Sequence, residues 1–183
     1  MEKKIIVIIA DGCEEIEALA PVDIFRRLNF AVTVAGLDKR NIVGSHQIAV
    51  TADRLLAECQ DEEFDALMLP GGMPGSKHLY ESETVAAMLR KIAGRGGIVS
   101  ANCAAPIVLA KAGLLTNRRF TMYPGFESFL DGARSTGRPV ENDNGVITGR
   151  GPGATFAFAA AIAAALGKST ELSELYQSMF ISF

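Results

Sequence analysis

Two kinds of hydrophobic pattern take turns along the chain. Short runs of valine, isoleucine and leucine that are nearly all apolar predict strands covered on both faces, as in a parallel sheet. Longer segments with apolar residues at helical spacing separate these runs. The predicted strands are residues 4–10, 31–36, 66–69 and 97–101, with short ones near Phe120 and at 146–148, and the predicted helices are 14–28, 82–95, 104–112, 153–166 and 169–179. The alternation predicts an α/β sandwich with a mainly parallel sheet and helices on both of its faces.

Turn and cap residues refine this pattern. Residues 42–51 alternate around Gly44 and predict a small antiparallel hairpin, and the Asn-Asp-Asn-Gly sequence at 142–145 predicts a hairpin turn. Ser82 has a side chain suited to cap the helix that follows it. The alanine-rich stretch at 157–165 predicts a helix packed tightly between neighbours or against a second subunit.

Composition limits the number of domains, the partners and the cellular location that we expect. A length of 183 residues with 49% hydrophobic content predicts one domain over residues 1–183. The formal net charge of -3, with no long run of either sign, argues against sequence-specific binding of nucleic acid and against binding to anionic membranes. The apolar run at 5–10 is too short for a signal peptide and is followed at once by acidic residues. We therefore expect a cytoplasmic protein without a membrane segment.

The cysteines and histidines are few and widely separated. Cys13, Cys59 and Cys103 form no CxxC pair, and His46 and His78 are isolated in polar segments. This spacing argues against a disulfide framework and against a zinc site, so no metal is expected. Cys13 precedes the first predicted helix and is expected at the rim of a crevice as a second oxidisable thiol. Cys59 is expected to be a half-exposed structural residue.

Cys103 lies where a predicted strand gives way to a predicted helix. A thiol there faces the unpaired N–H groups and the positive end of the helix dipole, and both favour thiolate over thiol. The alternative is that Cys103 is only a small buried apolar residue. In an open parallel sheet, ligands bind at the carboxyl ends of the strands, where residues 11–17, 70–75 and 102–104 all follow predicted strands. We therefore expect these three segments to converge around the thiol.

Three acidic residues crowd the start of the first predicted helix. Glu14 and Glu15 are interpreted as complementing the helix dipole. The helical face of Glu17 continues through uncharged residues, so its side chain is expected to point inward. A carboxyl group buried there would have a raised pKa, and it could donate a hydrogen bond to a thiolate or exchange protons with a substrate.

Two glycine-rich segments invite a comparison with known binding loops. A free N–H of Gly72, together with that of Ala104, would make an oxyanion-binding pair, whereas the alternative is an ordinary strand-to-helix turn. Residues 71–77 lack the Gly-Lys-Ser/Thr order of a phosphate loop. Residues 149–154 match GxGxxA, but no second strand follows to carry a ribose-binding acid, so close helix packing explains them better. No cofactor is expected.

Four motifs in order then resemble those of the ThiJ/PfpI superfamily, and most closely its DJ-type branch. They span nearly the whole chain and are residues 8–17 (IIADGCEEIE), 69–72 (LPGG), 100–106 (SANCAAP) and 149–153 (GRGPG). The resemblance implies a flavodoxin-like three-layer sandwich and a homodimer. It also implies that Cys103 is a readily oxidised nucleophile, that Glu17 is its protonated partner, and that Gly72 and Ala104 supply backbone donors.

The resemblance assigns further residues and sets limits on the chemistry. Asp23, Arg26 and Arg27 match a stretch that in relatives lies near the dimer contact and the pocket. The residue after the cysteine is Ala104, whereas the protease-like branch has histidine there, so a peptidase is not expected. Tyr123 stands where several relatives have a pocket histidine, and tyrosine is a poor base near neutral pH.

Two functions remain open at this point. The first is a cysteine-dependent enzyme that detoxifies small 2-oxoaldehydes or glycated adducts, by a glyoxalase-type or a deglycase-type reaction, during oxidative or carbonyl stress. The second is a redox sensor or redox-regulated chaperone that uses the oxidation of the same cysteine.

Overall fold

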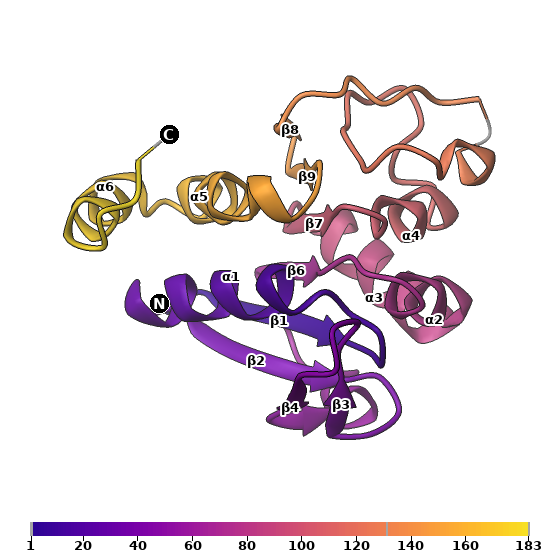
Figure 1. Cartoon of the computed structure of the whole chain (residues 1–183), viewed down its shortest axis with the longest axis horizontal. Helices are drawn as coiled ribbons and strands as arrows, with labels where there is room; N and C mark the ends of the chain where they lie inside the picture. The colour runs from indigo at the N-terminus through magenta and orange to yellow at the C-terminus, as the bar shows by residue number, and fades with distance from the viewer. Residues whose placement is uncertain (1, 131, 183) are drawn as a thin grey trace.

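The computed structural model describes residues 2–130 and 132–182, which contain a seven-stranded sheet in the order β5-β2-β1-β6-β7-β9-β8 (Figure 1). Neighbouring strands are parallel except for β8, which runs antiparallel to β9. A separate antiparallel hairpin is formed by β3 (Asn41–Val43) and β4 (Ala49–Thr51). The strands of the sheet are β1 (Lys4–Ile9), β2 (Ala31–Gly36), β5 (Arg54–Leu55), β6 (Ala66–Leu69), β7 (Ile98–Asn102), β8 (Val140–Asp143) and β9 (Val146–Gly149).

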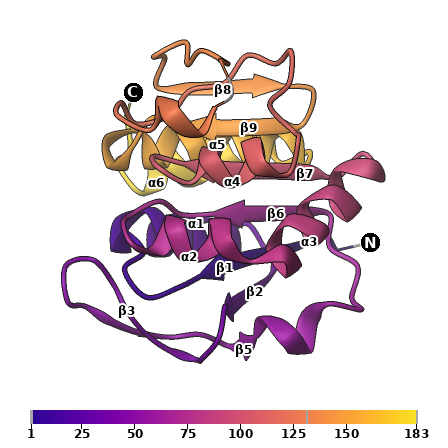
Figure 2. The ribbon, with the colours of Figure 1, turned by 90° about the vertical axis from the view of Figure 1, so that its right-hand side faces the viewer.

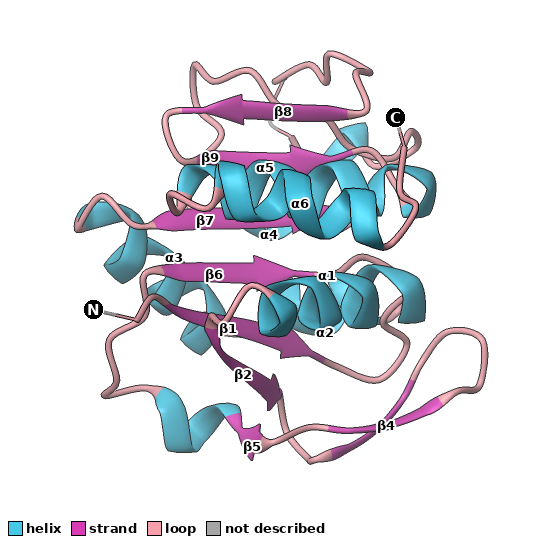
Figure 3. Cartoon of the chain, turned by 90° about the vertical axis from the view of Figure 1, so that its left-hand side faces the viewer, coloured by secondary structure: helices cyan, strands magenta, loops and turns pink. Residues whose placement is uncertain are grey.

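Helices cover both faces of this sheet. One face carries α2 (Gly75–Glu81), α3 (Glu83–Gly94) and α4 (Pro106–Lys111), which are nearest the viewer in Figure 2. The other face carries α1 (Glu15–Arg27), α5 (Thr155–Ala165) and α6 (Ser169–Ser178), which are in front in Figure 3. The buried side chains of β1 alternate between the two cores: Ile6 and Ile8 face α2–α4, and Val7 faces the other side. The predicted three-layer α/β sandwich is confirmed.

Most of the predicted elements are present within a few residues. Ser82 caps α3 by accepting a hydrogen bond from the backbone N–H of Val85 at 3.3 Å, as predicted. The predicted turn at 142–145 joins β8 to β9, with positive φ at both Asn144 (51°) and Gly145 (81°). The alanine-rich α5 packs against α1, α6 and the sheet.

The strand predicted near Phe120 is wrong. The N–H of Thr121 donates to the Oγ1 atom of Thr148 at 2.8 Å, so a side chain takes the place of a strand partner. Phe120 is nevertheless fully buried, which explains its apolar signal. The short strand β5, the strand β8 and the helix α2 were not predicted, because none of them has a strong apolar period of its own.

The order of the strands determines where the reactive residues lie. β6 pairs with β1 on one side and with β7 on the other, and all three are parallel. The segments that follow them therefore leave the sheet at the same edge, as predicted. Within the described residues, no helix is both long and apolar enough to cross a membrane.

Candidate functional site

Cys103 occupies the turn between β7 and α4. Its φ of 58° is unusual for a residue other than glycine. Its backbone N–H donates to the carbonyl of Gly149 at 3.0 Å and to Oδ1 of Asn102 at 3.0 Å. Its carbonyl accepts a hydrogen bond from the N–H of Tyr123 at 2.9 Å. The backbone that carries the thiol is thus fixed by three segments, and the residue remains partly exposed.

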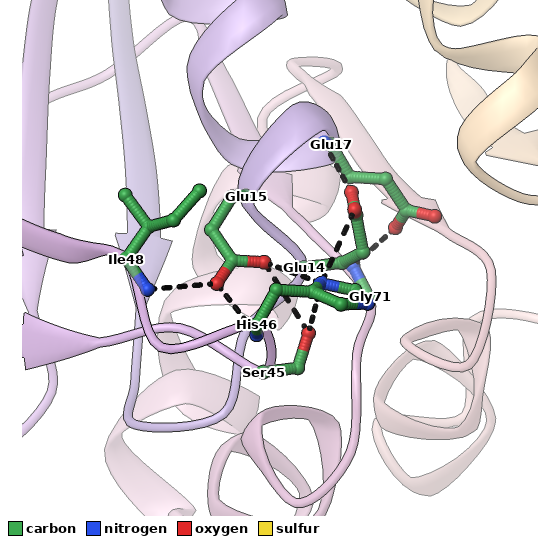
Figure 4. A network of polar contacts seen from close by, with 7 residues as sticks. All are labelled: Glu14, Glu15, Glu17, Ser45, His46, Ile48 and Gly71. Carbon is green, nitrogen blue, oxygen red and sulfur yellow. Dashed lines mark hydrogen bonds and ion pairs between the residues drawn. The ribbon is translucent and has the colours of Figure 1, made fainter.

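Glu17 points inward from the first turn of α1 and is fully buried, as predicted (Figure 4). Its backbone N–H donates to Oε2 of Glu14, the N-cap residue, at 2.7 Å. Its Oε2 accepts a hydrogen bond from the N–H of Gly71 at 2.7 Å. Its Oε1 is buried and has no hydrogen-bond partner among the described residues. The carboxyl group is therefore anchored by one oxygen and has the other available.

The environment of Glu17 favours its protonated form. Burial raises the pKa of the carboxyl to about 7, and the negative charge of Glu14 adds to this, while the N–H of Gly71 and the thiol of Cys103 oppose it. A carboxyl group with this pKa exchanges protons readily at neutral pH.

Gly71 allows the carboxyl and the thiol to lie side by side. A Cβ atom at this position would lie 2.5 Å from Cβ of Cys103 and 2.6 Å from Oε2 of Glu17. Such distances are far shorter than a van der Waals contact, so any side chain here would push the pair apart. Sequence analysis missed this role, because the contact joins residues distant along the chain.

The thiol is not acidified in the way that the helix terminus suggested. Burial raises the pKa of Cys103 to about 12, together with the nearby carboxylate charge of Glu17, while the N–H groups of Gly72 and Ala104 lower it. The expected lowering is therefore wrong, and burial, the largest cause, acts whether or not Glu17 is ionised. Helix α4 also begins only at Pro106, three residues beyond the thiol.

Glu17 and Cys103 titrate as a pair. When Glu17 is protonated, the repulsion from its charge is absent, and the two N–H groups still face the sulfur. The pKa of Glu17 is about 7 and that of Cys103 is about 12, so a single negative charge on the pair lies mainly on the carboxylate, with the proton on the sulfur. The carboxylate can accept that proton when the sulfur attacks a substrate.

The remaining predicted site residues lie at different distances from this pair. Tyr123 is joined to Cys103 through its backbone, and its half-exposed side chain lines a cavity of about 550 Å³ that is also lined by Arg150. Asp23, Arg26 and Arg27 lie on the exposed side of α1. Arg27 pairs with Asp23 at 2.9 Å, and Arg26 pairs with Asp53 at 2.7 Å.

The other two cysteines differ from expectation. Cys13 is only 1% exposed, and burial raises the pKa of its thiol to about 11, so the expected oxidisable thiol at the crevice rim is wrong. Cys59 is fully buried, and its Sγ donates to the carbonyl of Leu55 at 3.5 Å. The expected half-exposed position of Cys59 is also wrong, because its short 3₁₀ turn packs against the core.

Glu15 does more than complement the helix dipole, because it makes specific hydrogen bonds. It is 4% exposed and binds the β3–β4 hairpin, accepting hydrogen bonds from the N–H of His46 at 2.7 Å and from its Nδ1 at 2.8 Å (Figure 4). Nothing in the local sequence signals this contact, since the partners lie 31 residues apart.

Comparison with known proteins is consistent with this architecture. A model of the DJ-1/PfpI family matches residues 3–165. Protein dj-1beta of Drosophila melanogaster is 36% identical over 186 residues, which cover 100% of both chains. Its crystal structure superposes with a TM-score of 0.94 at 35% identity, again over 100% of both chains.

Two further relatives extend this similarity. The Parkinson disease protein 7 homolog of Danio rerio is 37% identical over 165 residues, 87% of each chain. A protein of Pyrococcus abyssi that is named a deglycase is 29% identical over 157 residues, 85% of this chain and 94% of that protein. The match to the family and the full-length similarity to dj-1beta show that the chain belongs to the DJ-1/PfpI family and, within it, to the DJ-1 branch.

Proposed function

We propose that this protein is a cysteine-dependent enzyme that detoxifies small 2-oxoaldehydes. Its substrate would be a free oxoaldehyde, in a glyoxalase-type reaction, or an early glycation adduct, in a deglycase-type reaction. One observation carries the proposal: the buried, unpartnered Oε1 of Glu17 lies in a carboxyl group beside the partly exposed thiol of Cys103. This combines a nucleophile with a proton carrier in one site.

The first step would be attack of the Cys103 sulfur on the aldehyde carbon of a substrate such as methylglyoxal. The thiol gives its proton to the carboxylate of Glu17 as the carbon–sulfur bond forms and the carbonyl electron pair moves to oxygen. Glu17 then returns this proton to the oxygen, which gives a hemithioacetal and leaves Glu17 as a carboxylate. The N–H groups of Gly72 and Ala104 face the sulfur and would be close to the developing oxyanion.

The second stage would depend on Glu17. The carboxylate would take the proton from the former aldehyde carbon and return a proton to the neighbouring carbonyl carbon, through an enediol. This converts the hemithioacetal into a lactoyl thioester. Water then cleaves the carbon–sulfur bond, which releases lactate and restores the thiol, so no cofactor is consumed.

The family relationship supports the same class of reaction. One relative is named a deglycase. Removal of an early glycation adduct by this chain would begin with attack of the sulfur on the carbon derived from the aldehyde. The difference between the two activities would lie in the group attached to the oxoaldehyde before it reaches Cys103.

The experiment that tests this proposal is an end-point assay of purified protein with methylglyoxal. We expect lactate to accumulate in proportion to protein concentration, well beyond one equivalent per thiol. Loss of methylglyoxal without lactate would show adduct formation alone and would contradict the proposal. An alkylated sample, blocked with iodoacetamide at Cys103, provides the matched control.

A redox-sensor function is the second candidate, and the exposure of the cysteines favours it. Cys103 is partly exposed, whereas both other cysteines of the chain are buried. Two equivalents of peroxide would oxidise its sulfur to a sulfinate and release two waters, and the same N–H groups would stabilise the product. We expect peptide mass mapping after mild peroxide treatment to find two added oxygens at Cys103 and none at Cys13 or Cys59. Equal oxidation of all three would contradict it.

We also propose that the protein is a homodimer. Exposed apolar side chains lie on α1, at Ile16 and Leu19, and on the adjoining hairpin, at Val43 and Ile48. Pairing of two copies through this surface would cover them. Sedimentation analysis should give twice the chain mass, and Ile16→Glu should give a monomer.

A further inference from the structure

The β3–β4 hairpin is held on the first turn of α1 by one buried carboxylate. Besides the two contacts with His46, Glu15 accepts weaker hydrogen bonds from the N–H of Ile48 and the hydroxyl of Ser45, both at 3.4 Å. Gly44 leaves room for this carboxylate, because a Cβ there would lie 2.2 Å from Oε1 of Glu15. The loop before the helix also binds the hairpin, through the N–H of Ser45 and the carbonyl of Cys13 at 2.8 Å.

The contacts continue from this carboxylate to Glu17 (Figure 4). Glu14 precedes Glu15, and its Oε2 accepts the hydrogen bond from the backbone of Glu17. The backbone N–H of Glu14 donates to the carbonyl of Gly71 at 2.9 Å, and the N–H of Gly71 binds the carboxyl of Glu17. The connection thus runs from the hairpin through Glu15, Glu14 and Gly71 to the carboxyl group of Glu17.

Two buried carboxylates along this connection share one neighbouring cationic side chain. Glu14 and Glu15 are 7% and 4% exposed, and both lie within ion-pair distance of His46, whose Nδ1 is 3.9 Å from Oε1 of Glu14 and 2.8 Å from Oε2 of Glu15. Among the described residues, no lysine or arginine forms an ion pair with either carboxylate. A protonated His46 is therefore the cation that offsets them.

Protonation of His46 and ionisation of Glu15 support each other. The hydrogen bond and charge of Glu15 raise the pKa of His46, with a smaller contribution from Glu14. Burial opposes ionisation of Glu15, but the hydrogen bonds from His46 and the backbone outweigh it and lower the pKa of Glu15 to about 2. His46 is exposed, so this ion pair alone adds little to stability. We expect the charge of His46 to act mainly on the pKa values of the neighbouring acidic groups.

We propose that His46 is a positioning residue for the reactive pair: as a cation it holds the hairpin on α1 and offsets the charges of Glu14 and Glu15 that act on Glu17. This inference rests on the proposed function in one respect, since it assumes that Glu17 and Cys103 are the reactive groups.

The direction of the effect follows from the charges. When His46 loses its proton, the negative charge of Glu14 is no longer offset, and that charge raises the pKa of Glu17. Glu17 then keeps its proton to a higher pH. Because the coupling is reciprocal, ionisation of Glu17 in turn favours the protonated form of His46.

The test compares two substitutions of His46 that differ in charge. His46→Gln keeps a polar side chain without charge, and His46→Arg keeps a permanent cation. The titration of Glu17 is followed by NMR of its ¹³C-labelled carboxyl carbon, assigned with Glu17→Gln. We expect the midpoint in His46→Gln to lie about 0.5 pH unit above that in His46→Arg at low ionic strength, as for charges several ångströms apart near a surface. The difference should shrink at high salt.

Two controls make the result decisive. His78→Gln removes the other histidine of the chain, which has no recorded contact with Glu14 or Glu15, and should titrate like the unmodified protein. Equal midpoints in His46→Gln and His46→Arg would overturn the proposal, and so would an equal shift in His78→Gln. The titration needs no substrate, so it can succeed or fail independently of the lactate assay. The pH dependence of lactate formation should shift in the same direction as the titration of Glu17. It should lie at higher pH in His46→Gln than in His46→Arg.

Discussion

Replacing Cys103 by serine should reduce lactate formation from methylglyoxal by roughly 10³-fold or more, as expected when a nucleophile is lost. Serine preserves the size and the polar character of the side chain. Its hydroxyl has a much higher pKa than a thiol, and no histidine lies in the described contacts of Cys103 to activate it. The backbone contacts of this turn do not involve the sulfur, so the variant should fold normally.

The measurement is the initial rate of lactate formation, with circular dichroism to confirm the fold. Cys13→Ala is the matched control, because Cys13 is buried and its thiol takes no part in the proposed mechanism. It should retain most of the activity. A Cys103→Ser variant that forms lactate at the unmodified rate would rule out a covalent role for this thiol and with it the proposed mechanism.

Replacing Glu17 by glutamine should lower the rate of lactate formation and, at the same time, make the thiol of Cys103 more acidic. The amide matches the carboxyl in shape, and its oxygen can still accept the hydrogen bond from Gly71. It cannot carry a proton between the two carbons of the substrate, so lactate formation should fall by about 10²- to 10⁴-fold. The same substitution removes a negative charge that raises the pKa of Cys103, so alkylation by iodoacetamide at pH 8 should become faster.

These two opposite changes distinguish loss of chemistry from loss of structure. Both are measured on one preparation, by lactate assay and by mass analysis of the Cys103 peptide after timed alkylation. Glu171→Gln, on α6, is the control that removes an exposed acidic residue on another helix. If alkylation and lactate formation fell together in Glu17→Gln, the carboxyl would be stabilising the turn rather than moving protons.

Apolar periodicity was sufficient to predict the layers of the fold, because the central strands β1, β6, β7 and β9 are buried on both faces. Ile5 to Ile9 are all fully buried, and this continuous run is hard to mistake for a surface element. Elements without such a pattern were missed. α2 has seven residues, of which only Gly75, Ser76 and Leu79 are buried, so it lacks a helical apolar face.

The inward position of Glu17 and the convergence of three loops were also predictable, from helical spacing and from the rule that parallel strands end at one edge. The acidity of the thiol was not. Its pKa depends first on the burial of the thiol in the folded chain, and then on the charge of a carboxyl group 86 residues away in sequence. The contact between Glu15 and His46 was beyond prediction for a similar reason, since it depends on how a hairpin folds back on a helix.

The hydrogen bond between Tyr123 and Cys103 has a practical consequence for protein engineering. The bond uses the backbone N–H of Tyr123, whose side chain is 50% exposed and lines a cavity that Arg150 also lines. Any residue except proline can supply the same N–H. Position 123 is therefore suited to a saturation library that varies substrate choice while the nucleophile stays in place.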